Sequence, residues 1–327
     1  MYYYDPMKIT LTRYSNNPIL VPTQNTWENI AVYNCGATIF NNRILLLYRA
    51  QGDDMISRFG LAFSDDGFHI TERLPQPIFE PDSDSEYETR GVEDPRITRI
   101  DDNYYITYTA ASFYQSVFRE GPEIRADGKT PWRVRVSLAH THDFKTFTRH
   151  GVIISHIDSK DAVLFPEKAD DQFMLIHRVS PDIRLAIGTN LDHLQERGPV
   201  LEARGVGTGW DKNKVGAGAP PIKTPYGWVL LYHGVHNDIY SLGLALLDLH
   251  EPTRVLARTE QPLLSPEKPY EKKGLVDNVV FSCGSVIKDD TLFVYYGAAD
   301  SSIGVATIEY QKVLDWAKLH HSHSHKR

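Results

Sequence analysis

The chain has 327 residues, of which 41% are hydrophobic and 24% are charged, and its formal net charge is -7. The acidic balance and the lack of a dense lysine and arginine block argue against nucleic acid and anionic membranes as partners. No stretch of about 18 apolar residues occurs, and the first residues contain no basic segment followed by an apolar one. We therefore expect neither a membrane span nor export.

Two cysteines, Cys35 and Cys283, both fall inside expected strands. Cysteines in such positions are typically buried free thiols rather than disulfide partners or catalytic nucleophiles. This cysteine usage favours a cytoplasmic location.

Five runs of apolar and aromatic residues recur along the chain. They are Ile44–Tyr48 before Arg49, Tyr104–Tyr108 before Thr109, Phe173–His177 before Arg178, Val229–Tyr232 before His233, and Phe293–Tyr296 before Gly297. Their starts lie 60, 69, 56 and 64 residues apart, a period that suits one four-stranded sheet per repeat. The sequence therefore predicts an all-β fold, a five-bladed β-propeller, as one domain over residues 1–319.

Helical periodicity is scarce. The best candidate is Tyr310–Leu319, where Val313, Leu314 and Trp316 form an apolar face. The histidine-rich residues 320–327 are expected to be a disordered tail without a function. The stretch Phe113–Pro131 has neither helical nor strand periodicity, and we expect a surface loop or lid there.

Just before each run lies a segment expected to be the innermost strand of its repeat. These segments are Tyr33–Ala37, Gly91–Ile97, Lys160–Lys168, Gly216–Pro221 and Asp277–Phe281. Proline and paired glycines are unusual in a central strand, so their presence here indicates backbone shaped for a ligand.

The second of these segments contains adjacent carboxylates, Glu93 and Asp94. Because side chains alternate along a strand, we expect that the two cannot both point into the central funnel, which argues against a two-carboxylate catalytic dyad. One should be catalytic and the other structural.

Seven spaced motifs support a family resemblance that runs through nearly the whole chain. They are Gly91–Ile97, Val163–Pro166, His177-Arg178, Lys214–Pro221, Tyr232–Gly234, Tyr240-Ser241 and Tyr295–Asp300. With these motifs the chain resembles glycoside hydrolase family 130, five-bladed propellers that cleave β-mannosidic linkages. The version of the Asp-Pro-Arg motif and the Lys160–Lys168 stretch look more like the branch that acts on β-1,2-mannosides.

The resemblance implies roles for individual residues. Asp94 would be the general acid, with its proton passing through a hydroxyl of the bound mannose. Arg96 would orient Asp94 or contact ligand, or else pair with Glu93 or Asp300 as scaffold. The remaining implied residues bind phosphate, namely Lys160, Arg178, Lys214, His233 and Tyr240, or the sugar, namely Asn34, Arg49, Arg58 and Asp300.

The residue types implied for phosphate binding suit that ligand, because arginine, lysine, histidine and tyrosine supply the donors that phosphate oxygens need. An inverting hydrolase needs a second carboxylate to activate water, whereas phosphate is already an anionic nucleophile. We therefore expect inverting phosphorolysis of β-1,2-mannobiose or β-1,2-oligomannan to α-mannose 1-phosphate and a shortened sugar. The alternatives are a β-1,4-mannosylglucose or β-1,4-mannooligosaccharide phosphorylase, a β-1,2-mannosidase and a non-catalytic carbohydrate-binding propeller.

Metal and nucleotide cofactors are not expected. His140 and His142 share a strand face, but no third ligand follows at a suitable spacing, and no glycine-rich loop opens a helix. The expected partners are a β-mannoside and inorganic phosphate as co-substrate. A homo-oligomer is compatible with the sequence, which leaves the oligomeric state and the direction of the reaction open.

Overall fold

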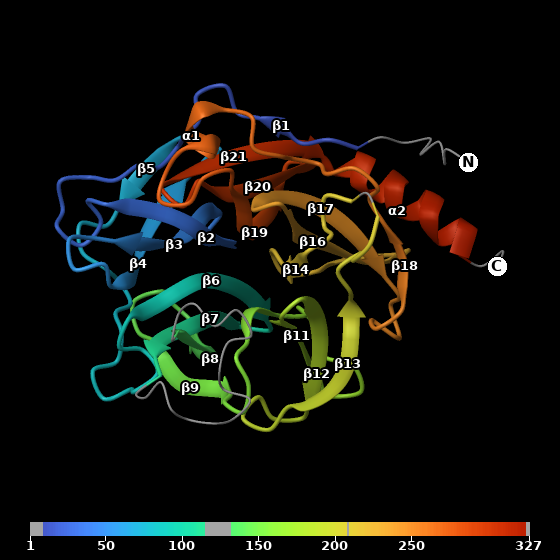
Figure 1. Cartoon of the computed structure of the whole chain (residues 1–327), viewed down its shortest axis with the longest axis horizontal. Helices are drawn as coiled ribbons and strands as arrows, with labels where there is room; N and C mark the ends of the chain where they lie inside the picture. The colour runs from blue at the N-terminus through green and yellow to red at the C-terminus, as the bar shows by residue number, and fades with distance from the viewer. Residues whose placement is uncertain (1–8, 115–131, 208, 325–327) are drawn as a thin grey trace.

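Antiparallel strands make up most of the fold. The computed structural model describes residues 9–114, 132–207 and 209–324. In those ranges the strands form four hydrogen-bonded sheets, and the largest, of eight strands, contains two successive groups, so that five groups follow one another around a common centre (Figure 1). The predicted all-β fold with a C-terminal helix is confirmed.

The strands of each group pair with their neighbours in an antiparallel manner. The first two groups are β2 (Ala31–Phe40), β3 (Arg43–Gln51), β4 (Ser57–Ser64) and β5 (Ile70–Arg73), then β6 (Gly91–Ile100), β7 (Asn103–Phe113), β8 (Trp132–Thr141) and β9 (Thr148–Ile154). The third is β10 (Lys160–Leu164), β11 (Phe173–Val179), β12 (Asp182–Gly188) and β13 (Gln195–Leu201). The fourth is β14 (Lys214–Ala217), β15 (Ile222–Thr224), β16 (Gly227–His236), β17 (Ile239–Leu247) and β18 (Val255–Arg258). The fifth is β19 (Val280–Lys288), β20 (Thr291–Ala298), β21 (Ser302–Glu309) and, from the start of the chain, β1 (Thr12–Arg13).

The five apolar runs lie in β3, β7, β11, β16 and β20, each of which lies between two strands of its own group, as β16 lies between β14 and β17. They are continuously apolar because both faces of each sheet are buried. In β3, Ile44 and Leu46 pack into one core cluster, whereas Leu45 and Leu47 pack into another. The alternation of side chains along the strand therefore divides one run between two cores.

Core clusters join consecutive groups. Among the described residues, the five largest clusters each combine side chains from two neighbouring groups, including one that joins the fifth group to the first. In that cluster Tyr295 and Val305 of the fifth group pack with Ile44 of the first. The short strand β1 also pairs with β21, through Thr12 opposite Thr307, so the start of the chain completes the last group (Figure 1).

A buried tyrosine and carboxylate pair recurs in four of the groups. In the first, Tyr48 at the end of the apolar run donates to Glu28, 2.8 Å away, and Arg73 of β5 donates to the same carboxylate at 2.6 Å. Equivalent sets of tyrosine, carboxylate and arginine are Tyr108, Glu88 and Arg149, then Tyr232, Asp211 and Arg204, then Tyr296, Glu271 and Arg13. Each set joins its apolar run to the segment before the group's first strand.

The C-terminal helix is longer than predicted. Helix α2 (Tyr310–Ser324) continues five residues beyond Leu319, so the first part of the expected disordered tail is helical. Val313 and Trp316 are buried in a core cluster, as the predicted apolar face requires, and Leu314 is partly buried. A second helix, α1 (Pro269–Lys272), is a single turn.

Most of the predicted loop Phe113–Pro131 lies outside the described residues, and Phe113 itself ends β7. Among the helices of the described ranges, none is long and apolar enough to cross a lipid bilayer.

Removing the buried carboxylate of one repeated set should destabilise the whole fold. Glu28 is fully buried and holds both Tyr48 and Arg73. Glu28→Ala leaves that arginine without its partner, and we expect the free energy of unfolding to fall by about 3–5 kcal/mol, measured by urea denaturation. Glu72→Ala, which removes a half-exposed partner of Arg43, should cost no more than about 1 kcal/mol. Equal losses for the two variants would contradict this role.

Candidate active site

One cavity of about 110 Å³ gathers seven of the ten predicted site residues. The predicted residues that line it are Asn34, Arg49, Asp94, Lys160, Arg178, Tyr240 and Asp300. Val276, Val279 and Phe281 complete the lining. The lining residues come from strands of all five groups and from the turn after β20, so separate parts of the sequence meet at one place.

Three of the first strands contain a bulge that aims a polar side chain toward this region. In β2, β6 and β10 the strand register shifts, and an asparagine or aspartate in the bulge has a positive φ: Asn34 at 46°, Asp94 at 53° and Asp161 at 53°. Asparagine and aspartate tolerate this left-handed conformation better than most residues. A bulge re-aims side chains that a regular strand would send to alternate faces.

Asp94 is buried among cations. Its carboxylate is 2% exposed, and it accepts hydrogen bonds from Asn34 at 2.9 Å and from Arg49 at 3.1 Å. The ammonium of Lys160 lies 3.6 Å from its other oxygen. Burial by itself would raise the pKa of Asp94, but Arg49, Lys160 and Arg96 outweigh burial and lower that pKa to about 2.

As expected, Glu93 and Asp94 do not both line the cavity, but they share one partner. Both carboxylates contact the same guanidinium, since Arg49 donates to Glu93 at 2.7 Å as well as to Asp94. The physical reason is the bulge, which breaks the regular alternation between these two residues. Only Asp94 lines the cavity, and Glu93 stabilises Arg49 from behind.

The cationic side of the cavity is organised by Arg178 and His233. Both contact the buried carboxylate of Asp161, at 2.6 Å from Nη1 of Arg178 and at 3.4 Å from Nε2 of His233. Burial lowers the pKa of His233 well below its ordinary value, and Arg178 adds to that effect although Asp161 opposes it. His233 is therefore a neutral imidazole, packed against Phe281 with ring centroids 4.4 Å apart.

Lys214 and His233 do not line the cavity themselves, but they adjoin residues that do. The Lys214 ammonium lies 4.9 Å from the centre of the Tyr240 ring, and the His233 ring centroid lies 6.1 Å from that of Tyr240. All five predicted phosphate-binding residues therefore belong to one neighbourhood.

Gly216 makes room for this cluster. A Cβ atom at this position would lie 2.3 Å from Cε1 of His233 and 2.5 Å from the Asp161 carboxylate. The glycines before Pro220 were expected to shape backbone for a ligand, and the structure shows that Gly216 instead accommodates side chains of the site. The break between β14 and β15 falls at the two prolines, which cannot donate a backbone hydrogen bond.

Arg96 is completely buried and links three groups. Its guanidinium donates to the carbonyl oxygens of Asp94, Ala217 and Gly218 at 2.9–3.0 Å and lies 3.3 Å from Asp161. The predicted scaffold partners, Glu93 and Asp300, are wrong for the described structure, because the carboxylate that pairs with Arg96 is Asp161. Sequence reasoning missed Asp161, although it follows Lys160 in the first strand just as Asp94 follows Glu93.

Asp300 is the second carboxylate of the cavity. Burial raises its pKa to about 6, with the neighbouring Asp94 adding to that rise and Arg49 opposing it. Its φ of 50° places it in a tight turn between β20 and β21.

Arg58 lies apart from the other predicted residues. Its guanidinium pairs with Asp54 at 2.7 Å and with Glu80 at 3.0 Å, on a surface that also includes Trp27 and Gln76. The structure therefore does not bring Arg58 into the cavity with Asp94.

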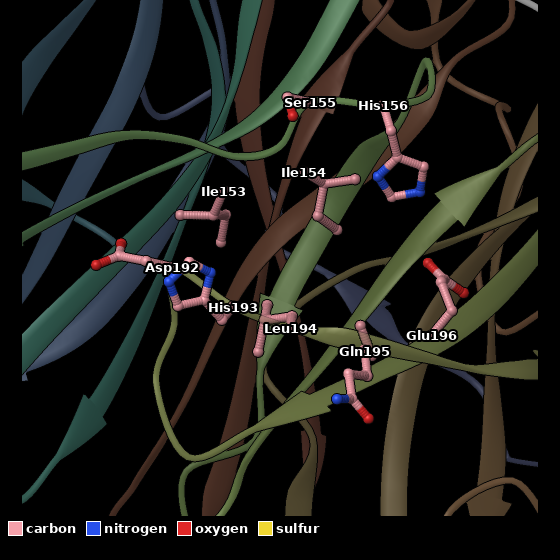
Figure 2. A pocket seen from close by; sticks show the side chains of 10 residues that line it. Ile153, Ile154, Ser155, His156, Asp192, His193, Leu194, Gln195 and Glu196 are labelled. Atoms are coloured by element: carbon pink, nitrogen blue, oxygen red, sulfur yellow. The ribbon is translucent and has the colours of Figure 1, made fainter.

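A separate pocket of about 310 Å³ lies between the end of β9 and the connection from β12 to β13 (Figure 2). Its polar side chains include His156, Asp192, His193 and Glu196, none of which was predicted to be functional. In the described ranges, no group of three or more histidine, cysteine, aspartate or glutamate residues is placed to hold a metal ion.

A chain of three side chains leads inward from Glu196 of this pocket, through His177, to Ser159. In composition it resembles a catalytic triad. Ser159 Oγ lies 2.7 Å from Nδ1 of His177, and Nε2 lies 2.5 Å from Glu196. Ser159 is 1% exposed, however, so no substrate carbonyl reaches its hydroxyl. His177 ends the third apolar run, where the other groups have tyrosine, and this chain is therefore the third group's version of the repeated buried set.

Comparison with known proteins identifies the class of protein that this arrangement of strands and side chains represents. The family model described as beta-1,4-mannooligosaccharide phosphorylase matches residues 4–122 and 124–319, and the chain belongs to glycoside hydrolase family 130. It is 40% identical to a 1,2-beta-oligomannan phosphorylase of Thermoanaerobacter sp. (strain X514), over 93% of this chain and 99% of that protein.

A second relative from the same organism, a beta-1,2-mannobiose phosphorylase, is 38% identical over 93% of this chain and 98% of its own length. Among solved structures, the Listeria innocua beta-1,2-mannobiose phosphorylase in complex with β-1,2-mannobiose is similar, with a TM-score of 0.80 and 29% identity. That match covers 95% of this chain and 100% of the other.

A methyl group at position 216 should disrupt the cationic side of the cavity. In Gly216→Ala the new Cβ displaces His233 and Asp161, and we expect kcat/KM to fall by at least about tenfold in a steady-state assay. Gly209→Ala is the matched control, since its Cβ would meet only side-chain atoms at 3.3 Å or more. Unchanged activity in folded Gly216→Ala would show that the close packing is dispensable.

Asp300 should make stability depend on pH. Because its pKa is raised in the folded state, its protonated form is favoured there, and the associated stability is lost as pH rises from about 4 through 6. We expect Asp300→Asn to raise the melting temperature at pH 7.5 relative to the wild type, with little difference near pH 4. Asp289→Asn, at an exposed turn, should show no such pH dependence. A stability difference that stays constant between pH 4 and 7.5 would contradict this assignment.

Proposed function

We propose that this chain catalyses inverting phosphorolysis of β-1,2-mannosides, β-1,2-mannobiose or β-1,2-oligomannan, to α-mannose 1-phosphate and a shortened sugar. One observation carries the proposal: Asp94 shares a single cavity with Lys160, Arg178 and Tyr240. A buried carboxylate and a group of anion-binding side chains are the two components that such a reaction needs. The two similar phosphorylases from Thermoanaerobacter support the β-1,2 linkage.

In this proposal Asp94 is the general acid. A phosphate oxygen attacks the anomeric carbon from the side opposite the leaving group, so the β linkage gives an α product. The bond between that carbon and the glycosidic oxygen breaks, and the oxygen takes the proton of Asp94, by way of a mannose hydroxyl. No base is required, because phosphate arrives as an anion.

Phosphate itself helps to load the acid with a proton. In the ligand-free cavity Lys160 lies near Asp94 and contributes to its low pKa. A phosphate dianion bound by Lys160 and Arg178 offsets their positive charge, which raises the pKa of Asp94 toward the working pH. Phosphate binding and protonation of Asp94 are therefore coupled in this account.

We assign the phosphate oxygens to Lys160, Arg178, Lys214, His233 and Tyr240. The sugar hydroxyls are assigned to Asn34, Arg49 and Asp300, which line the cavity beside Asp94. Arg58 is left out of this set, because its guanidinium is taken by Asp54 and Glu80. Inorganic phosphate is the co-substrate, and the mechanism uses no other cofactor.

We further propose that the five groups are the blades of one β-propeller and that residues 1–319 are one domain. The core clusters shared between consecutive groups, with one between the last and the first, support this architecture. A cytoplasmic location is part of the proposal, supported by the free, buried state of Cys35 and Cys283.

One observation favours a second candidate, hydrolysis of β-1,2-mannosides. Asp300 lines the cavity, and an inverting hydrolase needs a second carboxylate to activate water. The positive charges of Lys160 and Arg178 favour phosphate over water as the nucleophile, and for this reason we prefer the phosphorylase.

Product analysis separates the two functions. Purified protein is incubated with β-1,2-mannobiose, with and without inorganic phosphate, and mannose 1-phosphate and mannose are assayed separately. We expect one mannose 1-phosphate and one mannose per disaccharide, in the presence of phosphate only. Two mannoses per disaccharide, independent of phosphate, would establish the hydrolase, and a reaction confined to β-1,4-linked substrates would refute the linkage.

Asp94→Asn should remove proton donation but keep the binding site. We expect kcat on β-1,2-mannobiose to fall by about 100-fold to 10,000-fold, with sugar affinity by calorimetry largely retained. A dinitrophenyl β-mannoside, whose leaving group needs little protonation, should lose much less activity in the same variant. Wild-type rates on the disaccharide would refute Asp94 as the acid.

A further inference from the structure

The Asp161 carboxylate lies beside the cavity but has no access to it. Its side chain is fully buried, and it is not among the lining residues. Its closest polar neighbours are Nη1 of Arg178 at 2.6 Å, Nη2 of Arg96 at 3.3 Å and Nε2 of His233 at 3.4 Å. Asp161 therefore touches neither substrate nor attacking water, and its influence must pass through these neighbours.

Arg178 divides its guanidinium between two environments. The Nη1 nitrogen is held by Asp161, with His233 Nε2 at 3.3 Å. Within the described residues, the polar contacts of this guanidinium with His233 and Asp161 both run through Nη1, and the side chain lines the cavity. Asp161 thus fixes one edge of the guanidinium and leaves the other nitrogens available to a ligand.

The charges around the cavity are nearly balanced. The cations Arg49, Lys160 and Arg178 line it together with the anions Asp94 and Asp300. Behind them, Asp161 is the carboxylate that pairs with both Arg96 and Arg178. Removing this one negative charge would leave two buried arginines without an anionic partner.

We propose that Asp161 is a positioning residue that holds Arg178 in place and, through its own negative charge, lowers the affinity of the site for phosphate and for a sugar phosphate. The inference rests on the proposed function of Arg178. Two anions that share one guanidinium repel each other strongly in a poorly screened interior. A site with uncompensated arginines would bind phosphate tightly and would release a phosphorylated product slowly.

Two substitutions separate the charge of Asp161 from its shape. Asp161→Asn keeps an oxygen that can accept from Arg96 but removes the charge, whereas Asp161→Glu keeps the charge but changes the length of the side chain. The affinity for inorganic phosphate is measured directly by calorimetry on the folded proteins at constant ionic strength. We expect Asp161→Asn to lower the Kd for phosphate by at least about threefold, because a repulsive charge is lost.

The KM for phosphate should fall in parallel, while the KM for β-1,2-mannobiose stays within about twofold of the wild type. This split between the two substrates is a result that general destabilisation does not produce. Asp161→Glu should bind phosphate no more tightly than the wild type.

Asp211→Asn is the matched control. Asp211 is also fully buried, lies 2.9 Å from Arg204 and 3.6 Å from Arg258, and accepts from Tyr232. Unlike Arg178, the partner of Asp161, neither of these arginines lines the cavity. We expect Asp211→Asn to lower the melting temperature without changing the Kd for phosphate.

Unchanged or weaker phosphate binding in folded Asp161→Asn would overturn the proposal. Tighter binding in Asp161→Glu or in Asp211→Asn would also overturn it, because the effect would then not come from the charge at position 161. Failure of the proposed function gives a different result, namely a wild-type protein that neither binds phosphate nor needs it for turnover.

Discussion

The buried guanidinium of Arg96 is the interaction on which the geometry of the site depends. It binds the backbone carbonyl of Asp94 in β6, those of Ala217 and Gly218 beside β14, and the carboxylate of Asp161 in β10. One side chain thus fixes the first strands of three groups relative to one another. A buried arginine is stable only when such acceptors surround it, so the acid side and the cationic side of the cavity are set by the same contacts.

The scaffold around this centre is repetitive, and the site residues lie at positions where the repeated groups differ. Each apolar run packs into two cores, and four of the five end in a tyrosine bonded to a buried carboxylate. The residue after that position is not repeated in the same way, since it is Arg49, Thr109, Arg178, His233 or Gly297, with arginine in two of the groups. Three of these side chains, those of Arg49, Arg178 and His233, belong to the candidate site. A regular framework therefore presents a non-repeating set of functional groups.

Much of this arrangement could be predicted from the sequence. The apolar runs are long and evenly spaced, because each strand is buried on both faces, and their period predicted five repeats of strands. The cavity residues were found through motifs next to these runs. Asp94 and Arg178 are far apart in sequence, yet they line one cavity, because the groups of strands that carry them are arranged around one centre (Figure 1).

Several contacts of the site and the length of the C-terminal helix depend on features that the spacing of apolar residues does not reveal. A bulge in β6 lets Glu93 and Asp94 share Arg49, whereas strict alternation separates them. Asp161 and Arg96 were missed as a pair because their contact crosses between groups 65 residues apart in sequence. Arg58 was predicted to bind sugar, but the nearby carboxylates of Asp54 and Glu80 hold it elsewhere. Helix α2 continues past the last residue of its apolar face, and the residues of this continuation are polar.

The central claim is that one cavity holds the acid and the phosphate on either side of the scissile bond. The most direct measurement is a crystal structure of the Asp94→Asn variant with β-1,2-mannobiose and inorganic phosphate, in which the ternary complex does not turn over. We expect a mannose unit against Asn34 and Arg49, its glycosidic linkage near residue 94, and phosphate against Lys160 and Arg178 facing the anomeric carbon. Phosphate bound away from Arg178, or a water molecule held by Asp300 at the anomeric carbon in its place, would contradict the central claim.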